Sequence, residues 1–474
     1  MAIENTHYGA ERIGEMLKNC RRIHFIGIGG INMSSLAHIT AKRGYEVSGS
    51  DRTDTPLTRR IEAEGIRVSH IHDRSLVEEV DAVVYTVAIS ADNPEYVGAL
   101  ERGIPCISRA DYLGYLMTAY ETRIGVSGMH GKSSCTSMIA ETLIRGGADP
   151  TVLSGAELSI MGGAYCVGES QRFVFEACEY MDSFLDFCPT VAIVLNIEMD
   201  HVDYFKSMEQ IRSSYARFAA LTGEDGCAIL NADDPEVIAA LADYRGERIT
   251  FSTKDGKCDY VAKNITVYRG RSSFDLIEKG SLLCRATLGV TGAHHVYNAL
   301  AAAAACRRCG LSADAIREGL VHFGGAKRRM EFKGSLNGAE IYDDYGHHPT
   351  EIRATLGGAK GICEENGRLF CVYQPHTYSR TAALLDDFSA AFGSADRVIL
   401  APIYAARETD TLGVSSKLLA ERVGSKACYL PTLEEIADLL RRELTIGDTL
   451  VVMGAGDIYK LFDLLNADHV KGSL

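Results

Sequence analysis

Residues 122–147 read TRIGVSGMHGKSSCTSMIAETLIRGG, and this stretch decides the fold of the middle of the chain. A short apolar run leads into glycines, then into Gly131-Lys132-Ser133 and a segment with helical spacing. The N–H groups of a glycine turn and the positive end of the next helix together bind phosphate oxygens. Strand, glycine loop and helix in this order predict a nucleoside triphosphate site, with Lys132 on the outer phosphates and Ser133 on Mg²⁺.

The loop departs from the usual phosphate-loop spacing, because Val126 stands where that motif has its first glycine. The motif is therefore a variant built on Gly128 and Gly131. A glycine turn before an ordinary helix is the plain alternative. The strand before the loop and the long helical pattern after it favour the nucleotide site.

Length and composition indicate a multidomain globular protein rather than a nucleic-acid-binding or membrane protein. The 474 residues predict three domains, at about 150 residues each. A net charge of −14 argues against a general surface for nucleic acid or anionic lipid. The chain has no run of about 20 apolar residues and its charged start has no signal-peptide core, so we expect a cytoplasmic protein and no membrane partner. The 14 cysteines are then expected to be reduced.

Buried strands alternate with helical segments along most of the chain, which predicts parallel sheets and an α/β fold. Between residues 250 and 290 the pattern changes to short alternating segments, typical of antiparallel hairpins. We expect three domains: a Rossmann-like domain at 1–119, a phosphate-loop ATPase domain with extra antiparallel strands at 120–326, and a Rossmann-like domain at 327–474.

Acidic groups and a histidine follow two later strands of the predicted middle domain. RFVFEACEYMDSF (172–184) contributes Glu176 and Glu179, and VAIVLNIEMDHVDYF (191–205) contributes Asn196, Glu198, Asp200, His201 and Asp203. Ligands of open α/β sheets collect at the carboxyl ends of strands, so these groups should meet the phosphate loop. Solvated loop charges are the alternative for each residue alone. Because Mg²⁺ prefers carboxylates, Glu176 is the expected ligand of one ion, with His201 on a second.

A second glycine loop lies near the start, in IHFIGIGGINMSSLA (23–37), with Asp51 about 20 residues beyond its glycines. This resembles a dinucleotide fingerprint, and an NAD-dependent oxidoreductase is one reading. Asn32 replaces the third glycine of that fingerprint, however. A glycine loop at a helix start binds any pyrophosphate, including that of a UDP-sugar.

IYDDYGHHPTEI (341–352) and YQPHTYSRT (373–381) separate these readings. They resemble signatures of the Mur ligase family. HFIGIGGINMS, SGMHGKS, NIEMDHVDYF, HHVYNALAA, AKRRMEFKG, IYAARE and GAGDI match the family in the same order over essentially the whole chain. Within the family, the resemblance is to the members that join L-alanine to UDP-N-acetylmuramate for peptidoglycan synthesis. It implies UDP-binding, ATPase and amino-acid-binding domains, ATP as co-substrate, and two Mg²⁺ ions.

The resemblance also implies a role for each matching residue. Lys132, His201 and Glu176 are the expected catalytic residues, and Ser133, Glu176 and His201 the expected metal ligands. The expected ATP-binding residues are Gly128, His130, Gly131, Lys132, Ser133, Ser134, Asn298, Arg329 and Asp344. The expected UDP-sugar-binding residues are Gly27, Gly29, Gly30, Ile31, Asn32 and Asp51. The expected amino-acid-binding residues are Tyr345, His347, His348 and Arg380.

The chain departs from the family pattern at several of these motifs. Met129 and Ser133 both stand where the family has threonine, although Ser133 keeps the hydroxyl that binds metal. Thr377 replaces an arginine, so no role is assigned to it. The choices between Arg328 and Arg329, and between His347 and His348, stay open.

The implied reaction begins with attack of the lactoyl carboxylate on the γ-phosphate of ATP, giving an acyl phosphate. L-alanine then displaces phosphate. Such chemistry depends on positioning and charge stabilisation more than on covalent side-chain chemistry. Two alternatives besides the oxidoreductase are a silent binding module on the same fold and a sister ligase that adds a tripeptide. Monomer and homodimer are both open.

Overall fold

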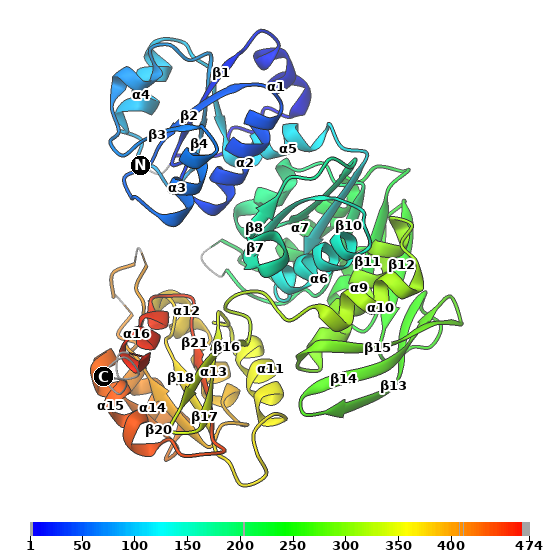
Figure 1. Cartoon of the computed structure of the whole chain (residues 1–474), viewed down its shortest axis with the longest axis vertical. Helices are drawn as coiled ribbons and strands as arrows, with labels where there is room; N and C mark the ends of the chain where they lie inside the picture. The colour runs from blue at the N-terminus through cyan, green and yellow to red at the C-terminus, as the bar shows by residue number, and fades with distance from the viewer. Residues whose placement is uncertain (1–2, 202–203, 407, 411, 467–474) are drawn as a thin grey trace.

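The computed structural model describes residues 3–201, 204–406, 408–410 and 412–466, and it contains three separate α/β sheets. Figure 1 shows them as three bodies in chain order, with the first sheet in blue, the second in cyan to green and the third in yellow to red. The three-domain α/β prediction is confirmed. Segments 118–121 and 323–330 connect one sheet unit to the next.

The first sheet has five parallel strands in the order β3-β2-β1-β4-β5. Apolar strand residues such as Phe25 and Val84 are fully buried between the helices on its two faces. Its strands are β1 (Arg22–Ile26), β2 (Glu46–Ser50), β3 (Arg67–Ser69), β4 (Ala82–Tyr85) and β5 (Cys106–Ser108). Its helices are α1 (Ala10–Leu17), α2 (Ile31–Lys42), α3 (Pro56–Ala63), the 3₁₀ turn η1 (Arg74–Val77), α4 (Pro94–Glu101) and α5 (Arg109–Met117).

The second sheet has ten strands in the order β15-β14-β13-β12-β11-β10-β6-β9-β7-β8. The seven adjacent strands β13-β12-β11-β10-β6-β9-β7 run parallel to one another. β8 is antiparallel to β7, β14 is antiparallel to β13, and β15 is antiparallel to β14. The antiparallel hairpins expected between residues 250 and 290 are present. The strands are β6 (Thr122–Ser127), β7 (Thr151–Leu158), β8 (Gly163–Cys166), β9 (Arg172–Glu176), β10 (Val191–Val194), β11 (Cys227–Asn231), β12 (Glu247–Ser252), β13 (Tyr260–Tyr268), β14 (Arg271–Glu278) and β15 (Ser281–Thr291).

The interface between helices α6 and α9 of this second unit is rich in small residues. In α9 the run of alanines from 301 to 305 is buried, which lets α9 pack closely on α6. The alanines also favour the helix intrinsically. The helices are α6 (Lys132–Arg145), the 3₁₀ turns η2 (Ser159–Met161) and η3 (Tyr180–Asp186), α7 (Met208–Ala220), α8 (Pro235–Ala240), α9 (His294–Arg308) and α10 (Ala313–His322).

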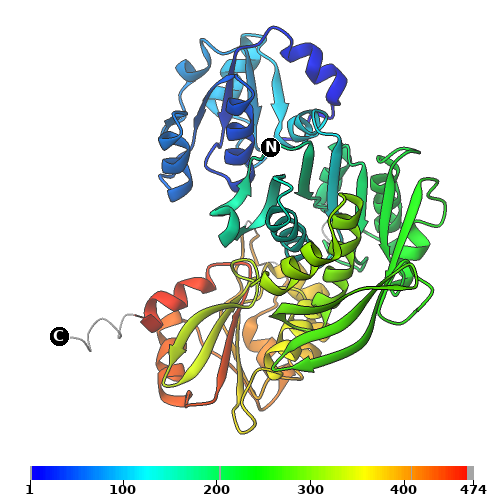
Figure 2. The same ribbon diagram turned by 45° about the vertical axis from the view of Figure 1, so that its right-hand side comes forward.

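The third sheet has six strands in the order β16-β17-β21-β18-β19-β20, and only β16 is antiparallel. It lies below the second unit in Figures 1 and 2, where α11 faces the green helices of that unit. Its strands are β16 (Glu331–Leu336), β17 (Ala339–Asp344), β18 (Leu369–Tyr373), β19 (Arg397–Leu400), β20 (Ala427–Tyr429) and β21 (Thr449–Met453). Its helices are α11 (Pro349–Lys360), α12 (Tyr378–Ala383), α13 (Leu385–Ala391), α14 (Ser416–Val423), α15 (Leu433–Glu443), the 3₁₀ turn η4 (Ile458–Lys460) and α16 (Leu461–Asn466).

Candidate active site

The phosphate loop follows β6 and leads directly into α6. Gly128 and Gly131 have φ of 142° and 84°, conformations that favour glycine. A Cβ on Gly131 would lie 2.8 Å from Oδ1 of Asn298, so the position also lacks room for a side chain. Asn196, after β10, accepts a hydrogen bond from the His130 amide at 2.8 Å and donates one to the His130 carbonyl at 2.9 Å. The neighbouring strand thereby fixes the loop.

Lys132 pairs with Glu179, an acid that follows β9 and that has no role assigned from the sequence. Its Nζ lies 2.9 Å from Oε2 of Glu179, and Nε2 of His201 lies 3.1 Å from Oε1 of the same group. Glu179 is only 1% exposed. Burial opposes its charge, but Lys132 and His201 outweigh burial and lower the pKa of Glu179. Burial likewise opposes the charge of Lys132, and Glu179 is the main cause that raises the pKa of the lysine.

Glu176 is the last residue of β9 and pairs in register with Val126 of β6, which places it beside the strand that enters the loop. Its Oε2 accepts a hydrogen bond from the amide of Gly155 at 2.9 Å. Burial opposes the charges of Lys132 and Arg329, and Glu176 is one of the groups that raise the pKa of each, after Glu179 for Lys132 and after Glu351 and Asp344 for Arg329. Glu176 therefore shares the electrostatic environment of the loop, although Glu179 is the acid that contacts Lys132.

A cavity of about 210 Å³ opens beside the phosphate loop, between the second and third units. The third unit contributes Asp344 from β17 and part of α11, and the connection between the units contributes Arg329. Burial raises the pKa of Asp344 to about 6. Of the nine residues expected to bind ATP, six line this cavity: His130, Gly131, Ser134, Asn298, Arg329 and Asp344.

The two neighbouring arginines of the connection between the units point to different partners. Arg329 lies 3.4 Å from the Ser133 hydroxyl, at the start of α6. Arg328 donates to the carbonyl of Gly454 at 2.7 Å and lies 3.3 Å from Asp343. The structure thus places Arg329 at the phosphate loop and Arg328 inside the third unit.

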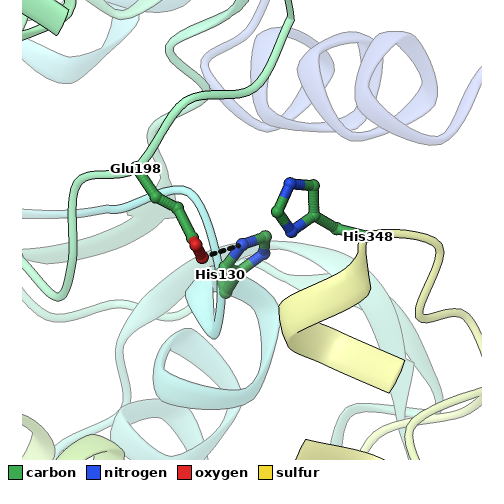
Figure 3. A group of neighbouring side chains, drawn as sticks. All are labelled: His130, Glu198 and His348. Atoms are coloured by element: carbon green, nitrogen blue, oxygen red, sulfur yellow. Dashed lines mark hydrogen bonds and ion pairs between the residues drawn. The ribbon is translucent and has the colours of Figure 1, made fainter. Parts of the chain in front are cut away.

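His130 connects the phosphate loop to α11. Its Nε2 lies 3.1 Å from Oε1 of Glu198, and its Nδ1 lies 3.5 Å from Oε1 of Glu351. Figure 3 shows the His348 ring above that of His130, with the two ring centres 4.7 Å apart. Burial opposes a charge on His130, but the two carboxylates outweigh it and raise the pKa of the imidazole to about 9.

His130, Glu198 and His348 each offer one ligand atom, and these atoms lie within 4.8 Å of one another. That geometry approaches a metal site. However, His130 is already paired with two carboxylates, and its raised pKa favours the protonated imidazole. A protonated imidazole has no lone pair for a metal. We therefore treat the group as an ionic contact between the two units.

The residues expected to bind the amino acid gather between β17, α11 and α12. The His347 ring lies 5.7 Å from both Tyr345 and His376. The Arg380 side chain is 11% exposed and donates a hydrogen bond through Nε to Oδ1 of Asp200 at 3.1 Å, across the boundary between the second and third units. His348 is buried, and its Nε2 has no partner among the described residues.

The residues expected to bind the UDP-sugar surround the first turn of α2, a separate place in the first unit. Asp51 accepts a hydrogen bond from the Gly29 amide at 3.0 Å. Gly27, Gly30 and Asp51 line a cavity of about 590 Å³ there. Ile31 and Asn32 are the first residues of α2 and are exposed.

The groups around the loop suit Mg²⁺. Ser133 offers a hydroxyl, and Glu176 and Glu179 offer carboxylates, which are the oxygen donors that Mg²⁺ prefers. Both oxygens of Glu179 are already paired, Oε2 with Nζ of Lys132 at 2.9 Å and Oε1 with His201 at 3.1 Å. His201 has a left-handed backbone, with φ of 49°, and this turn aims its ring at Glu179.

Four described carboxylates of the site, Glu179, Glu198, Asp200 and Glu351, have no role assigned from the sequence. Glu179, Glu198 and Asp200 follow the two strand ends of the motif segments, and Asp203 of the same segment lies outside the described residues. Glu351 could have been found from its place three residues after His348. It completes a capping box at the start of α11, a pattern visible in sequence.

The fold and this site define a class: three-domain ligases in which a phosphate loop faces a third domain across a nucleotide cavity. Family models agree, since residues 22–121 match "Mur ligase family, catalytic domain", 126–306 match "Mur ligase middle domain" and 328–456 match "Mur ligase, glutamate ligase domain". The chain belongs to the Mur ligase family.

Individual relatives narrow the comparison. The chain is 43% identical to the UDP-N-acetylmuramate–L-alanine ligase of Clostridium novyi, over 94% of this chain and 97% of that one. It is 45% identical to the ligase of the same name from Lachnospira eligens, over 93% and 96%. The crystal structure of the UDP-N-acetylmuramate-alanine ligase MurC of Thermotoga maritima superposes with a TM-score of 0.79 at 26% identity, covering 95% of this chain and all of that one. Among the described residues, no helix is long and apolar enough to cross a membrane.

Proposed function

We propose that this chain joins L-alanine to the lactoyl carboxylate of UDP-N-acetylmuramate, with conversion of ATP to ADP and phosphate. The observation that carries the proposal is the phosphate loop: its residues His130 and Gly131 line one cavity with Arg329 and Asp344, and Lys132 at the start of α6 is held by Glu179. The names of relatives 43% and 45% identical over nearly the whole chain support the same substrates. The matching signatures at 341–352 and 373–381 support an amino-acid pocket in the third unit.

In the proposed mechanism, a lactoyl carboxylate oxygen attacks the γ-phosphorus and the bond to the β–γ bridging oxygen breaks, leaving ADP. Lys132 and Arg329 stabilise the negative charge that moves during this transfer. The amine of L-alanine then attacks the acyl carbon, phosphate leaves, and the amide remains after loss of a proton. The residues act chiefly by holding three substrates in line.

The remaining residues hold the substrates. Asn298 and Asp344 line the cavity beside the loop and are proposed to contact the nucleoside of ATP. Gly29, Gly30 and the first turn of α2 would hold the diphosphate of the UDP-sugar, as helix N-termini do. Tyr345, His347, His348 and Arg380 would receive L-alanine, with Arg380 suited to its carboxylate.

Ser133, Glu176 and His201 are proposed to hold two Mg²⁺ ions, and Glu179 lies between Lys132 and His201. When bound, the ions supply charge neutralisation for the triphosphate. The residues themselves keep Lys132 charged and oriented, since Glu179 fixes its ammonium group at the loop.

The test is ADP release with UDP-N-acetylmuramate, ATP and a panel of amines. We expect L-alanine to trigger ADP formation, and the panel should include glycine, L-serine and a tripeptide. Release with the tripeptide alone would assign the chain to the sister activity. Absence of amine-dependent release with every member would refute the ligase proposal. The boundaries at 119/120 and 326/327, the cytoplasmic location and the oligomeric state stay predictions.

A further inference from the structure

Glu351 serves two loops at once. It lies in the first turn of α11 with a side chain 13% exposed. Its Oε2 accepts the amide N–H groups of His347 at 2.8 Å and His348 at 3.2 Å, so it shapes the loop that carries the proposed amino-acid pocket. Its Oε1 faces the other way, 3.5 Å from Nδ1 of His130 and 3.6 Å from Arg329.

His130 is held as firmly on the nucleotide side. Asn196 bonds to both the amide and the carbonyl of His130, at 2.8 and 2.9 Å. Glu198 pairs with Nε2 of the ring, as Figure 3 shows, and its second oxygen accepts the hydroxyl of Thr350 on α11 at 2.9 Å. The imidazole is therefore clamped between a carboxylate of the second unit and a carboxylate of the third.

The charges favour this contact. Burial is the largest influence on Glu351 and opposes its charge, yet His130, His347 and Arg329 lower the pKa of Glu351 well below its ordinary value. Both members of the pair are largely shielded from water, where charge-assisted hydrogen bonds are strong and an unpaired partner is costly.

We propose that the His130–Glu351 pair couples the nucleotide site to the amino-acid pocket, with His130 acting as a positioning residue in the proposed ligase reaction. When the phosphate loop holds His130 against Glu351, this contact stabilises the first turn of α11. Glu351 in turn fixes the backbone of His347 and His348. Such coupling is reciprocal: L-alanine and ATP each tighten the binding of the other. This inference rests on the proposed function, since it needs both substrates to bind where that proposal puts them.

The experiment compares the wild type with His130→Asn, Glu351→Gln and the double variant. Gln at 351 keeps an oxygen that accepts the backbone N–H groups of His347 and His348, but it removes the charge that His130 meets. We expect each single substitution to raise the KM for L-alanine roughly 10-fold, within the usual range of coupling between sites. The KM for UDP-N-acetylmuramate should change little. The KM for L-alanine of the double variant should be no higher than that of the more impaired single variant, because both substitutions break the same contact.

The dissociation constant of the ATP analogue adenylyl imidodiphosphate, measured by calorimetry with and without L-alanine, gives the second readout. We expect L-alanine to tighten analogue binding several-fold in the wild type and not in the variants. Additive effects in the double variant, or coupling retained in His130→Asn, would overturn the proposal. Should Glu351→Gln fail to fold, the His130→Asn arm alone decides.

Glu365→Gln is the matched control, because Glu365 is an exposed glutamate of the same unit. It should leave both KM values and the coupling unchanged. The wild type separates the two proposals: no ADP release with UDP-N-acetylmuramate and L-alanine refutes the ligase function itself. Normal ADP release by the wild type, together with variants whose KM values and coupling equal those of the wild type, refutes only the coupling role.

Discussion

The Nζ atom of Lys132 lies 2.9 Å from Oε2 of Glu179, while Oε1 of the same carboxylate lies 3.1 Å from His201. A lysine of the second unit's phosphate loop, an acid after β9 and a histidine after β10 thus form one buried contact. The arrangement fixes the ammonium group at the loop and keeps it charged. Substitution of Glu179 and substitution of Lys132 should therefore reduce activity to different extents.

Lys132→Ala should reduce ADP release by at least about 100-fold, because a preorganised charge on the transferring phosphate is lost. The measurement is the initial rate with saturating UDP-N-acetylmuramate and L-alanine. Lys417→Ala, at an exposed lysine of α14, is the control and should keep full activity. Near-normal turnover of the Lys132 variant would mean that this lysine does not serve the reaction.

Glu179→Gln should lower kcat by roughly 10- to 100-fold while changing the KM for UDP-N-acetylmuramate little. The substitution keeps the shape of the side chain but removes the charge that orients Lys132 and His201, and buried charge-assisted bonds are the strong ones. Steady-state kinetics with each substrate varied in turn checks this. Glu169→Gln, at an exposed loop position, should behave as wild type. An equal loss in both variants would contradict the role of Glu179.

Gly29→Ala should raise the KM for UDP-N-acetylmuramate by about 10-fold, because the added Cβ would clash with Asp51 and with the buried Thr58 and would force the loop to move. The added Cβ would lie 2.7 Å from Oδ2 of Asp51, whose carboxylate holds the loop. The KM for ATP should stay within about twofold, since sites this far apart act independently. Gly393→Ala, which meets no atom within 4 Å, is the control. A selective effect on ATP instead would place the UDP-sugar elsewhere.

Arg329→Ala and Arg328→Ala should have different effects although the residues are neighbours. Arg329 faces Ser133, so its loss should raise the KM for ATP by roughly 10-fold, as expected for a charge-assisted bond. Arg328 bonds inside the third unit, so its loss should lower the melting temperature with a smaller change in that KM. A larger rise in the KM for ATP in Arg328→Ala than in Arg329→Ala would mean that Arg328, not Arg329, serves the nucleotide site.

The His130 clamp should weaken at alkaline pH. Glu198 and Glu351 outweigh burial and raise the pKa of His130 to about 9, from an ordinary 6.5. Because the folded-state pKa is raised, the stabilisation is complete below about pH 6.5 and is lost as the pH rises through 9. Arg329, His294 and His348 surround the same pair. The melting temperature of the wild type should exceed that of His130→Asn by about 2–4 °C at pH 6.5. The two should converge by about pH 10; a constant difference would contradict the ion pair.

Local sequence was sufficient for the elements and for most of the nucleotide site. The phosphate loop, β9 and β10 are contiguous segments, and strand ends of a parallel sheet lie at one edge. Three residues expected to bind ATP, His130, Gly131 and Ser134, belong to the loop and α6 and line one cavity, whereas Asn298, Arg329 and Asp344, which line it too, were expected only from the family resemblance. The antiparallel strands β13 to β15 were visible as short alternating runs for the same local reason.

The choice among adjacent residues was decided by tertiary structure. Glu176 ends β9 and Glu179 follows it, but the chain then turns through Met181 and Asp182, with φ of 55° and 54°, and Glu179 is the one that reaches Lys132. Arg328 itself has φ of 57°, which turns it away from Arg329. A left-handed backbone is uncommon for Met and Arg, so residue type did not indicate these turns.

The sequence by itself determined three α/β units, a phosphate loop with Lys132 and the set of polar residues that surround it. Only the tertiary structure decided that Glu179 pairs with Lys132, that Arg329 rather than Arg328 faces Ser133, and that His130 meets Glu351 from α11. The physical reason is that periodicity and motif spacing report contacts along one element. A contact between two units depends on how their sheets pack, which no short stretch of sequence encodes.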